Sequence, residues 1–492
     1  MNIKIIQKLL SLVYFALASA LLLCMFGGLW LGEPFDSQSI KGFIKSILIV
    51  FIIAIALRQC SRTHSKQSSF FRREALCTIG LSWLSTSLFG ALPFYFGIEN
   101  CSLVDAVFES TSGLTTTGAT IFSDFSDLSY SMFLWRSLSQ WIGGLGVLVF
   151  FVAILTSLGA GAKILFSNES SATASDFEQG RIQDGVIKLL VFYLSLTVLC
   201  FFAYKLAGMN WFDAVNHAMT TIATGGYSTH SESFAYFNNL KIELVSVFFM
   251  LISATTFIFL IRILEGSKDV LKKGAEVYAF YILTIVSTSL IAFSISQTTI
   301  EATNFNGLRH ALFQTVSIIT TTGYSTGNYD LWTPLAKIIL MFLMVMGGCS
   351  GSTSGGLKII RVIIAFKAIF KTIVQTYRPN KTIITRFGTK TLSDTFVHNI
   401  LLYILFIFTI QGMSVIVLSF LEPSLNLISL FSVAQSSLYN IGPGFDAIGP
   451  TQNFGFLNAQ TKLFLSFLMI LGRLEIYALV VLFIPNIWKR YS

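Results

Sequence analysis

Charged residues are scarce in this sequence, and their scarcity narrows the class of protein. Only 12% of the 492 residues are charged, whereas 54% are hydrophobic and the mean hydropathy is +0.72. An average soluble domain is about a quarter charged, and a soluble core could not bury so much apolar surface. Apolar runs recur from residues 9–31 to residues 464–484. We count about ten runs of bilayer-crossing length, which predicts an all-α integral membrane protein.

Catalytic and metal-binding patterns are also missing from the sequence. The six cysteines lie mostly inside apolar runs, without the paired spacing of a disulfide framework or a zinc site. The five histidines show no metal-ligand spacing, and the apolar runs contain no paired acids and no Ser/His pair. These observations argue against an intramembrane enzyme, and we expect no covalent cofactor.

The net charge of +9 could indicate a nucleic-acid partner, but the positions of the basic residues indicate a membrane topology instead. Five lie in residues 58–73, four in 262–273 and eight in 358–390, whereas residues 95–130 and 422–460 contain none. Cytoplasmic loops of membrane proteins carry the excess of Lys and Arg. The pattern therefore predicts cytoplasmic basic loops, two cytoplasmic termini, and membrane lipid rather than nucleic acid around the chain.

One structural unit repeats four times after two N-terminal helices at residues 9–31 and 42–57. Each unit has an apolar crossing, a short amphipathic stretch, a Thr/Gly cluster, a polar segment and a second crossing. We predict a two-helix extension at residues 1–72, followed by pore repeats at 73–160, 161–266, 267–392 and 393–492.

The four Thr/Gly clusters read TTTGA at 115–119, IATGG at 222–226, TTTGY at 320–324 and YNIGP at 439–443. The amphipathic stretch before each cluster is too short to cross a bilayer, so it must dip in and return. Non-helical backbone at that depth has to be buried in protein or line a watery cavity, which favours four loops around one axis. The approach Asp105-Ala106-Val107 recurs as Asp213-Ala214-Val215, with the second approach one residue shorter than the first.

Loops of this kind suit a dehydrated cation. Rings of backbone carbonyls replace the water shell of such an ion without a fixed charge, and glycine adopts the torsions that turn successive carbonyls toward one axis. The short preceding helices would direct the negative ends of their dipoles at the same point. The alternative interpretation is that these glycines only allow helices to pack closely. Four glycines at matched repeat positions make this alternative the weaker of the two interpretations.

Five short motifs are specific enough to indicate a family. They are TSGLTTTGA at 111–119, ATGGYS at 223–228, TTGYST at 321–326, GGCSGSTSGGLK at 347–358 and GRLE at 472–475. Together they resemble the Trk/Ktr/HKT superfamily of potassium transporters, and specifically its TrkH-type potassium uptake subunit, over essentially the whole chain. The resemblance implies transport of K⁺ across a bacterial inner membrane, a homodimer with one pore per protomer, and a cytosolic nucleotide-binding (TrkA-like) regulatory subunit.

The resemblance also implies which residues form a selectivity filter. The family places a glycine at the selective position of each loop, and its sodium-preferring members carry serine in the first loop. Gly118 therefore implies a preference for potassium. The expected ion-binding set is Thr116, Thr117, Gly118, Ala223, Thr224, Gly225, Thr321, Thr322, Gly323, Asn440, Ile441 and Gly442.

Residues 347–356 contain five glycines, three serines and a threonine in the middle of an expected crossing. Each interior glycine costs a helix roughly 1 kcal/mol relative to alanine, so we predict two half-helices joined by a polar intramembrane loop. In the family that the chain resembles, this loop lies under the filter and gates the pore together with an arginine. The expected gating residues are Gly347, Gly348, Ser350, Gly351, Ser352, Thr353, Gly355, Gly356 and Arg473.

Three alternatives stay open at the level of the sequence. Arg473 carries an intramembrane charge that costs roughly 2.5–3.5 kcal/mol to insert, and it could instead form a structural ion pair with an acid elsewhere. Glu109 could pair with Arg136 or face the outer vestibule. The transport could be a symport of potassium with sodium or protons, for which broken helices are also typical, although four units of one orientation favour a pore.

Overall fold

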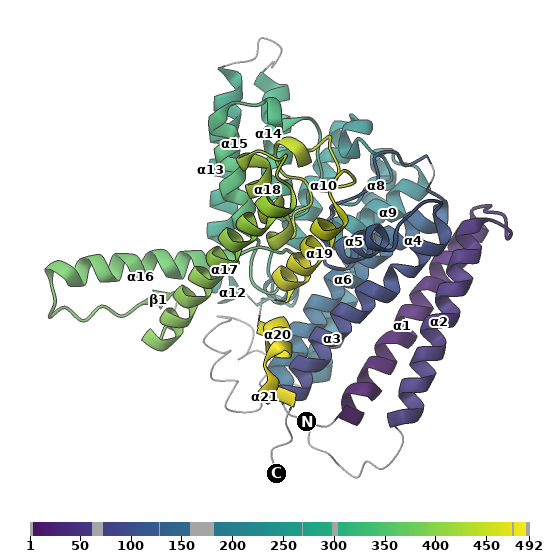
Figure 1. Cartoon of the computed structure of the whole chain (residues 1–492). Helices are drawn as coiled ribbons and strands as arrows, with labels where there is room; N and C mark the ends of the chain where they lie inside the picture. Colours follow the sequence, from purple (N-terminus) through teal and green to yellow (C-terminus); the bar gives the residue numbers. More distant parts are fainter. Residues whose placement is uncertain are drawn as a thin grey trace.

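The long apolar runs of the chain form α-helices (Figure 1). The computed structural model describes residues 3–61, 72–126, 128–157, 182–267, 269–297, 304–388, 390–474 and 477–488. Strands β1 (Arg386–Phe387) and β2 (Lys390–Thr391) pair in a short antiparallel ribbon. Helices satisfy their backbone polar groups within one segment, which hydrocarbon surroundings require. The predicted all-α integral membrane fold is confirmed.

Two helices precede four repeats, and each repeat has a first helix, a pore helix and a second helix. The extension is α1 (Ile3–Trp30) and α2 (Gln38–Ser61). Repeat 1 contains α3 (Arg72–Gly90), α4 (Leu92–Gly97), pore helix α5 (Leu103–Leu114) and α6 (Tyr130–Ser157). Repeat 2 contains α8 (Ile182–Ala207), pore helix α9 (Trp211–Ile222), η1 (Ser233–Tyr236), α10 (Leu240–Ser253) and α11 (Phe257–Leu264).

The other two repeats follow the same order. After α12 (Asp269–Lys273), repeat 3 contains α13 (Ala275–Ser296), pore helix α14 (Asn304–Ile319), η2 (Tyr329–Leu331), α15 (Pro334–Val345) and α16 (Ile359–Tyr377). Repeat 4 contains α17 (Asp394–Leu421), pore helix α18 (Leu427–Tyr439), η3 (Asp446–Ile448) and α19 (Ala459–Arg473). The described chain ends with α20 (Tyr477–Val480), η4 (Val481–Phe483) and α21 (Pro485–Trp488).

Two of the expected crossings are interrupted. By length and composition, 6 helical segments of the described chain can cross a membrane unbroken, namely α1, α2, α3 with α4, α8, α13 and α17. Helices α10 and α11 pass the same test together but bend by 98° at residues 254–256, where we had predicted no break. In repeat 3, α15 ends at Val345 and α16 begins only at Ile359. The remaining crossings of our count fall on α6 and α19.

Three pore helices begin with the same cap. The side chains of Ser102, Asn210 and Asn426 each accept a hydrogen bond from the backbone N–H three residues later, over 3.1, 2.7 and 2.9 Å. Such caps satisfy amide groups that the first helical turn leaves without partners. Asp105 and Asp213 lie in the first turn, where a negative charge is favourable. The pore helices therefore start from matched points and end at the Thr/Gly clusters.

The four repeats close into a ring. The second helix of each repeat packs on the pore helix of the next, because α6 contacts α9, α10 contacts α14 and α15 contacts α18. Helix α19 of the last repeat then packs on α5 of the first. This cyclic packing brings the four pore helices around one axis.

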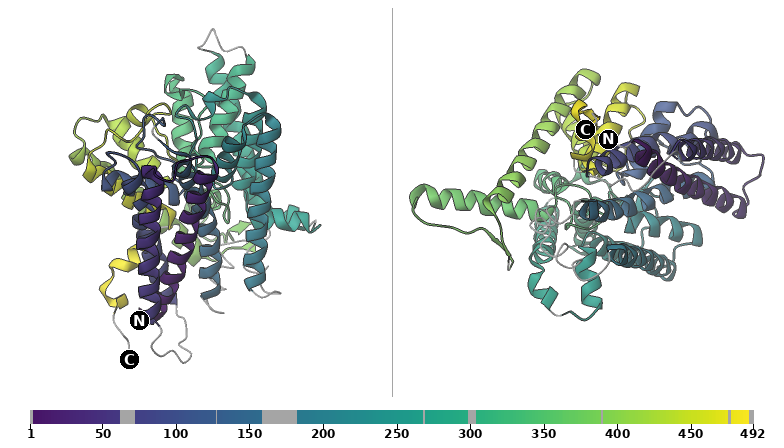
Figure 2. Two further views of the ribbon diagram at one scale, coloured as in Figure 1. Left: turned by 90° about the vertical axis from the view of Figure 1, so that its right-hand side faces the viewer. Right: turned by 90° about the horizontal axis from the view of Figure 1, so that it is seen from below.

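Helix α16 lies outside the ring. It runs across the direction of α1, α2 and α3 and projects beyond the rest of the bundle (Figure 1). Its outer part exposes large apolar side chains, namely Phe366, Ile369, Phe370 and Ile373. The first helix begins and the last one ends on one side of the bundle, as Figure 2 shows.

Candidate functional site

The four Thr/Gly clusters share one backbone path. Each pore helix is followed by a non-glycine residue with positive φ, which is uncommon for such residues. These residues are Thr116 (φ 53°), Thr224 (51°), Thr321 (56°) and Asn440 (56°). Two positions later each loop has a glycine with positive φ, namely Gly118 (82°), Gly226 (82°), Gly323 (85°) and Gly442 (97°). The fourth cluster, which lacks the threonine run, follows the same path.

The second loop requires a correction of the expected register. Its glycine with positive φ is Gly226, whereas we had matched Gly225 to Gly118. Pore helices α5 and α9 both have 12 residues, so the second approach is not shorter than the first. With two adjacent glycines, the sequence match to the first one was wrong, and Gly225 occupies the position of Thr117. The shared Gly-Tyr-Ser-Thr of residues 226–229 and 323–326 is the signal that could have fixed the register.

The loops contact one another in cyclic order. A Cβ atom on Gly118 would collide with the carbonyl oxygen of Gly225, one on Gly226 with that of Thr322, and one on Gly323 with that of Ile441. A Cβ atom on Gly442 would lie 2.7 Å from the carbonyl oxygen of Thr117, which closes the circle. Carbonyls at one matched position of all four loops therefore surround the axis, and only glycine fits beside them.

Above this ring, Glu109 and Arg136 form a buried ion pair. Arg136 Nε lies 2.8 Å from Glu109 Oε1, and both side chains are almost fully buried. The guanidinium also donates to the carbonyl oxygen of Ser228 in the second loop, over 3.3 Å. Tyr227 Oη donates to the carbonyl oxygen of Glu109, over 2.9 Å. Of the two alternatives for Glu109, the structure shows the pair with Arg136, which links the first two loops.

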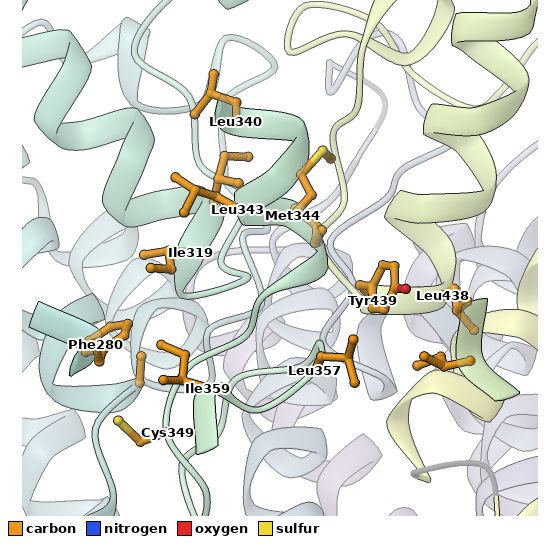
Figure 3. Close-up of a cluster of buried hydrophobic side chains, with 14 of the residues drawn as sticks. Phe280, Ile319, Leu340, Leu343, Met344, Cys349, Leu357, Ile359, Leu438 and Tyr439 are labelled. Carbon is orange, nitrogen blue, oxygen red and sulfur yellow. The ribbon is translucent and has the colours of Figure 1, made fainter. Parts of the chain in front are cut away.

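The glycine-rich segment of repeat 3 forms an irregular loop between α15 and α16, with a turn at residues 350–351. Gly347 N donates to the carbonyl oxygen of Leu357 (2.7 Å), so the segment folds back on itself. Apolar side chains of α15 and those of Leu357 and Ile359 flank the loop, and Figure 3 shows these two together with Met344 of α15. The break between α10 and α11 lies alongside, because Cys349 N donates to the carbonyl oxygen of Ala254 over 2.8 Å.

This loop between α15 and α16 contacts three of the four pore loops. Thr353 Oγ1 donates to the carbonyl oxygen of Ile222 (3.1 Å) and lies 3.3 Å from Thr224 Oγ1. Gly355 N donates to Thr321 Oγ1 over 2.7 Å. A Cβ atom on Gly355 would lie 2.6 Å from the carbonyl oxygen of Tyr439. The side chains of Thr224 and Thr321, two of the residues with positive φ, therefore contact the intramembrane loop directly.

Arg473 lies against the same loop. Its side chain is 4% exposed, and Nη1 donates to the carbonyl oxygen of Thr353 over 2.9 Å. Its Nε and Nη2 atoms have no hydrogen-bond partner in the part of the chain that the structure describes. No acid within that part forms an ion pair with it, so the structural ion pair that we considered is not seen there.

Two further charged side chains, which sequence reasoning missed, hold the ends of the loop. Glu276 Oε1 on α13 accepts a hydrogen bond from Ser350 N over 2.7 Å. Lys358 Nζ donates to the carbonyl oxygen of Ser354. Both side chains are buried. The polar loop is therefore anchored by an acid, a lysine and an arginine within an apolar bundle.

Four repeats of helix, pore helix, loop and helix, closed into a ring, define the class of this membrane protein. The sequence pattern of the TrkH family, described as "Cation transport protein", matches residues 43–304 and 275–490. The chain belongs to this family. Our expectation of a transport protein rather than an enzyme is confirmed by that membership.

Relatives of known name cover most of the chain. It is 34% identical over 426 residues to the Trk system potassium uptake protein TrkH of Halomonas elongata, covering 85% of this chain and 86% of that protein. It is 37% identical over 414 residues to TrkI of the same organism, covering 83% of each. The crystal structure of the potassium transporter TrkH from Vibrio parahaemolyticus matches with a TM-score of 0.85 at 29% identity, over 99% of this chain and 100% of that one.

Proposed function

We propose that the chain conducts K⁺ through the ring formed by its four pore loops. The observation that carries the proposal is the cyclic contact between each loop glycine and the preceding carbonyl of the next loop. Carbonyls held in this way can replace the water shell of a cation, and the C-terminal ends of four pore helices favour positive charge at the same point. The printed names of the relatives support potassium as the ion.

The selectivity filter comprises the residues expected from the sequence, extended by one. Its members are Thr116, Thr117, Gly118, Ala223, Thr224, Gly225, Gly226, Thr321, Thr322, Gly323, Asn440, Ile441 and Gly442. K⁺ is the transported ion and has no other site in this proposal. Gly118, Gly226, Gly323 and Gly442 are the positions at which a side chain would enter the ring.

The gate consists of the intramembrane loop and Arg473. The loop contacts the filter through Thr353 and Gly355, and Arg473 holds the carbonyl of Thr353. The closed state then combines polar chain in the conducting path with a positive charge beside it. Gly347, Gly348, Ser350, Gly351, Ser352, Gly355 and Gly356 supply the flexibility and hydrogen bonds by which the loop can move aside.

The chain works as a homodimer in a bacterial inner membrane, with both termini in the cytoplasm. Helix α16 projects from the bundle with exposed apolar side chains, among them Phe366 (62% exposed) and Phe370 (67%), and a second copy is the partner that covers them. Light scattering in detergent should give twice the protomer mass for the wild type and one protomer mass for the double variant Phe366→Ser/Phe370→Ser. A dimeric double variant would contradict this interface.

A cytosolic nucleotide-binding subunit docks on the inner face beside the gate. The eight basic residues within 358–390 support this location, because they are the largest of the three basic groups along the chain and follow directly on the intramembrane loop. Purification from native membranes in mild detergent should recover a soluble acidic or nucleotide-binding protein with the chain. Recovery of the chain alone, with its dimer intact, would contradict the proposal.

Coupled symport is the second candidate, and the broken helices α10–α11 and α15–α16 are the observation that favours it. The two functions differ in what drives the ion. A pore should carry K⁺ down its own gradient in liposomes without any sodium or pH gradient, with a current that reverses at the potassium equilibrium potential. A symporter should stop when the second ion is removed.

A further inference from the structure

The second filter loop lacks a contact that the first and third loops share. In those loops two threonine hydroxyls lie against each other, Thr115 with Thr117 (2.7 Å) and Thr320 with Thr322 (2.8 Å). The residues at these positions in the second loop are Ala223 and Gly225, which have no hydroxyl. Its backbone torsions nevertheless match those of the other loops. A different contact must therefore stabilise the backbone of the second loop.

The side chain of Gln140 on α6 lies where a side chain at position 225 would otherwise be. Its Nε2 donates to the carbonyl oxygen of Gly225 over 2.7 Å, and its Oε1 accepts a hydrogen bond from Tyr227 N over 3.1 Å. The side chain is fully buried. A Cβ atom on Gly225 would collide with the amide of Gln140, so glycine at 225 and glutamine at 140 require each other.

The two hydrogen bonds span Gly226, the glycine with positive φ. They therefore fix the chain on both sides of this glycine. The carbonyl of Gly225 belongs to the ring, where it faces Gly118. Within the described chain, the matched carbonyls of Thr117, Thr322 and Ile441 accept no hydrogen bond from a side chain. Because a carbonyl oxygen has two lone pairs, the one on Gly225 can accept from Gln140 and still bind an ion.

We propose that Gln140 is a specificity-determining residue, which sets the position and the field strength of one of the four ring carbonyls. It is a positioning residue, since it acts through Gly225 and not on the ion. The inference rests on the proposed potassium filter. The four ring carbonyls are then unequal. The carbonyl oxygen of Gly225 accepts a hydrogen bond from a side chain of the neighbouring repeat, whereas within the described chain those of Thr117, Thr322 and Ile441 accept none from a side chain.

The test uses the purified full-length chain in liposomes, with K⁺ and Na⁺ permeability measured separately. Gln140→Leu removes both hydrogen bonds at similar volume, and the K⁺/Na⁺ permeability ratio should fall roughly fivefold to tenfold because a freed carbonyl no longer discriminates by position. Gln435→Leu is the matched control. It also removes a buried amide, which donates to the carbonyl oxygen of Met341 over 2.7 Å, and should leave the ratio unchanged.

A second pair of variants keeps the inference testable if Gln140→Leu fails to assemble. Gly225→Thr alone places a side chain against Gln140 and should lower the ratio. Gln140→Ala with Gly225→Thr makes room for a threonine at the position of Thr117 and Thr322, and should recover most of the lost selectivity. If Gln140 had only a structural role, the losses in the K⁺/Na⁺ permeability ratio caused by the two substitutions would add up in the double variant.

The outcomes separate this inference from the proposed function. A wild-type chain that does not favour K⁺ over Na⁺ would overturn the filter itself. A selective wild type with an unchanged ratio in Gln140→Leu, or with additive losses in the double variant, would overturn only the role of Gln140.

Discussion

Replacing Arg473 by alanine should open the pore. In the structure its Nη1 donates to the carbonyl oxygen of Thr353 over 2.9 Å, within the loop that contacts the filter. A hydrogen bond from a charged donor contributes about 1.5–3 kcal/mol, and about 1.4 kcal/mol changes an equilibrium tenfold. The opening equilibrium of the loop should therefore shift by roughly tenfold to a hundredfold. The fold should survive, because two nitrogen atoms of the buried guanidinium have no partner in the described chain.

The assay is K⁺ flux into liposomes that contain the purified chain and no cytosolic subunit. Lys462→Met is the matched control, because Lys462 lies on the same helix and its buried side chain pairs with the partly exposed Asp105 (2.6 Å), which lies on α5 and not on the loop. The control should lower thermal stability without raising flux, since it leaves the charge of Asp105 unpaired. Arg473→Ala with flux at or below wild type and an unchanged gel-filtration profile would refute the gating role.

Three other changes test separate parts of the account. Gly118→Ser forces a side chain onto φ 82° and against the carbonyl of Gly225, a strain of about 1–3 kcal/mol, and should lower the K⁺/Na⁺ permeability ratio in the same liposomes. Glu276→Gln weakens the contact with Ser350 N by about 1 kcal/mol and should raise unregulated K⁺ flux severalfold, less than Arg473→Ala does; unchanged flux would contradict this. Hydrogen bonds from Ser429 and Asn426 hold the pKa of Asp446, in the loop between α18 and α19, below its ordinary value of 3.8. The ionised carboxylate of Asp446 thus stabilises the fold at pH values above 3.8. This contribution is lost as the pH falls through the lowered pKa of the folded protein. The melting-temperature difference between wild type and Asp446→Asn should therefore be present at neutral pH and vanish in strong acid, and a constant difference would count against it.

The sequence was sufficient where composition alone decides the structure. Apolar runs, basic loops and the glycine content of residues 347–356 indicated the membrane class, the repeats and the interruption between α15 and α16. The break at residues 254–256 gave no such signal, because Ala254 favours a helix and each of the two threonines costs a helix at most about 0.7 kcal/mol, too little to predict a break. Hydrogen bonds from the intramembrane loop stabilise this break, among them Cys349 N to the carbonyl oxygen of Ala254 and Thr353 N to that of Ser253. Contacts between distant segments are not readable from local composition.

The filter could be predicted in outline but not in register. The glycine of each loop was visible, but we matched Gly225 instead of Gly226, although the Gly-Tyr-Ser-Thr shared with the third loop favours Gly226, the residue with positive φ. Gln140 escaped notice for a similar reason, since its partners lie 85 and 87 residues away. A lone amide in an apolar crossing is costly to bury without hydrogen bonds, and that cost was the available signal.

Ion selectivity of the purified chain tests the central claim most directly. Liposomes containing only this protein should be loaded in parallel with K⁺, Rb⁺, Na⁺ or Li⁺, and the flux of each ion measured under the same driving potential. A ring of carbonyls sized for a dehydrated potassium ion predicts fast K⁺ and Rb⁺ flux and slow Na⁺ and Li⁺ flux. Equal flux of all four ions, or flux that follows only their mobility in water, would contradict the four-loop filter.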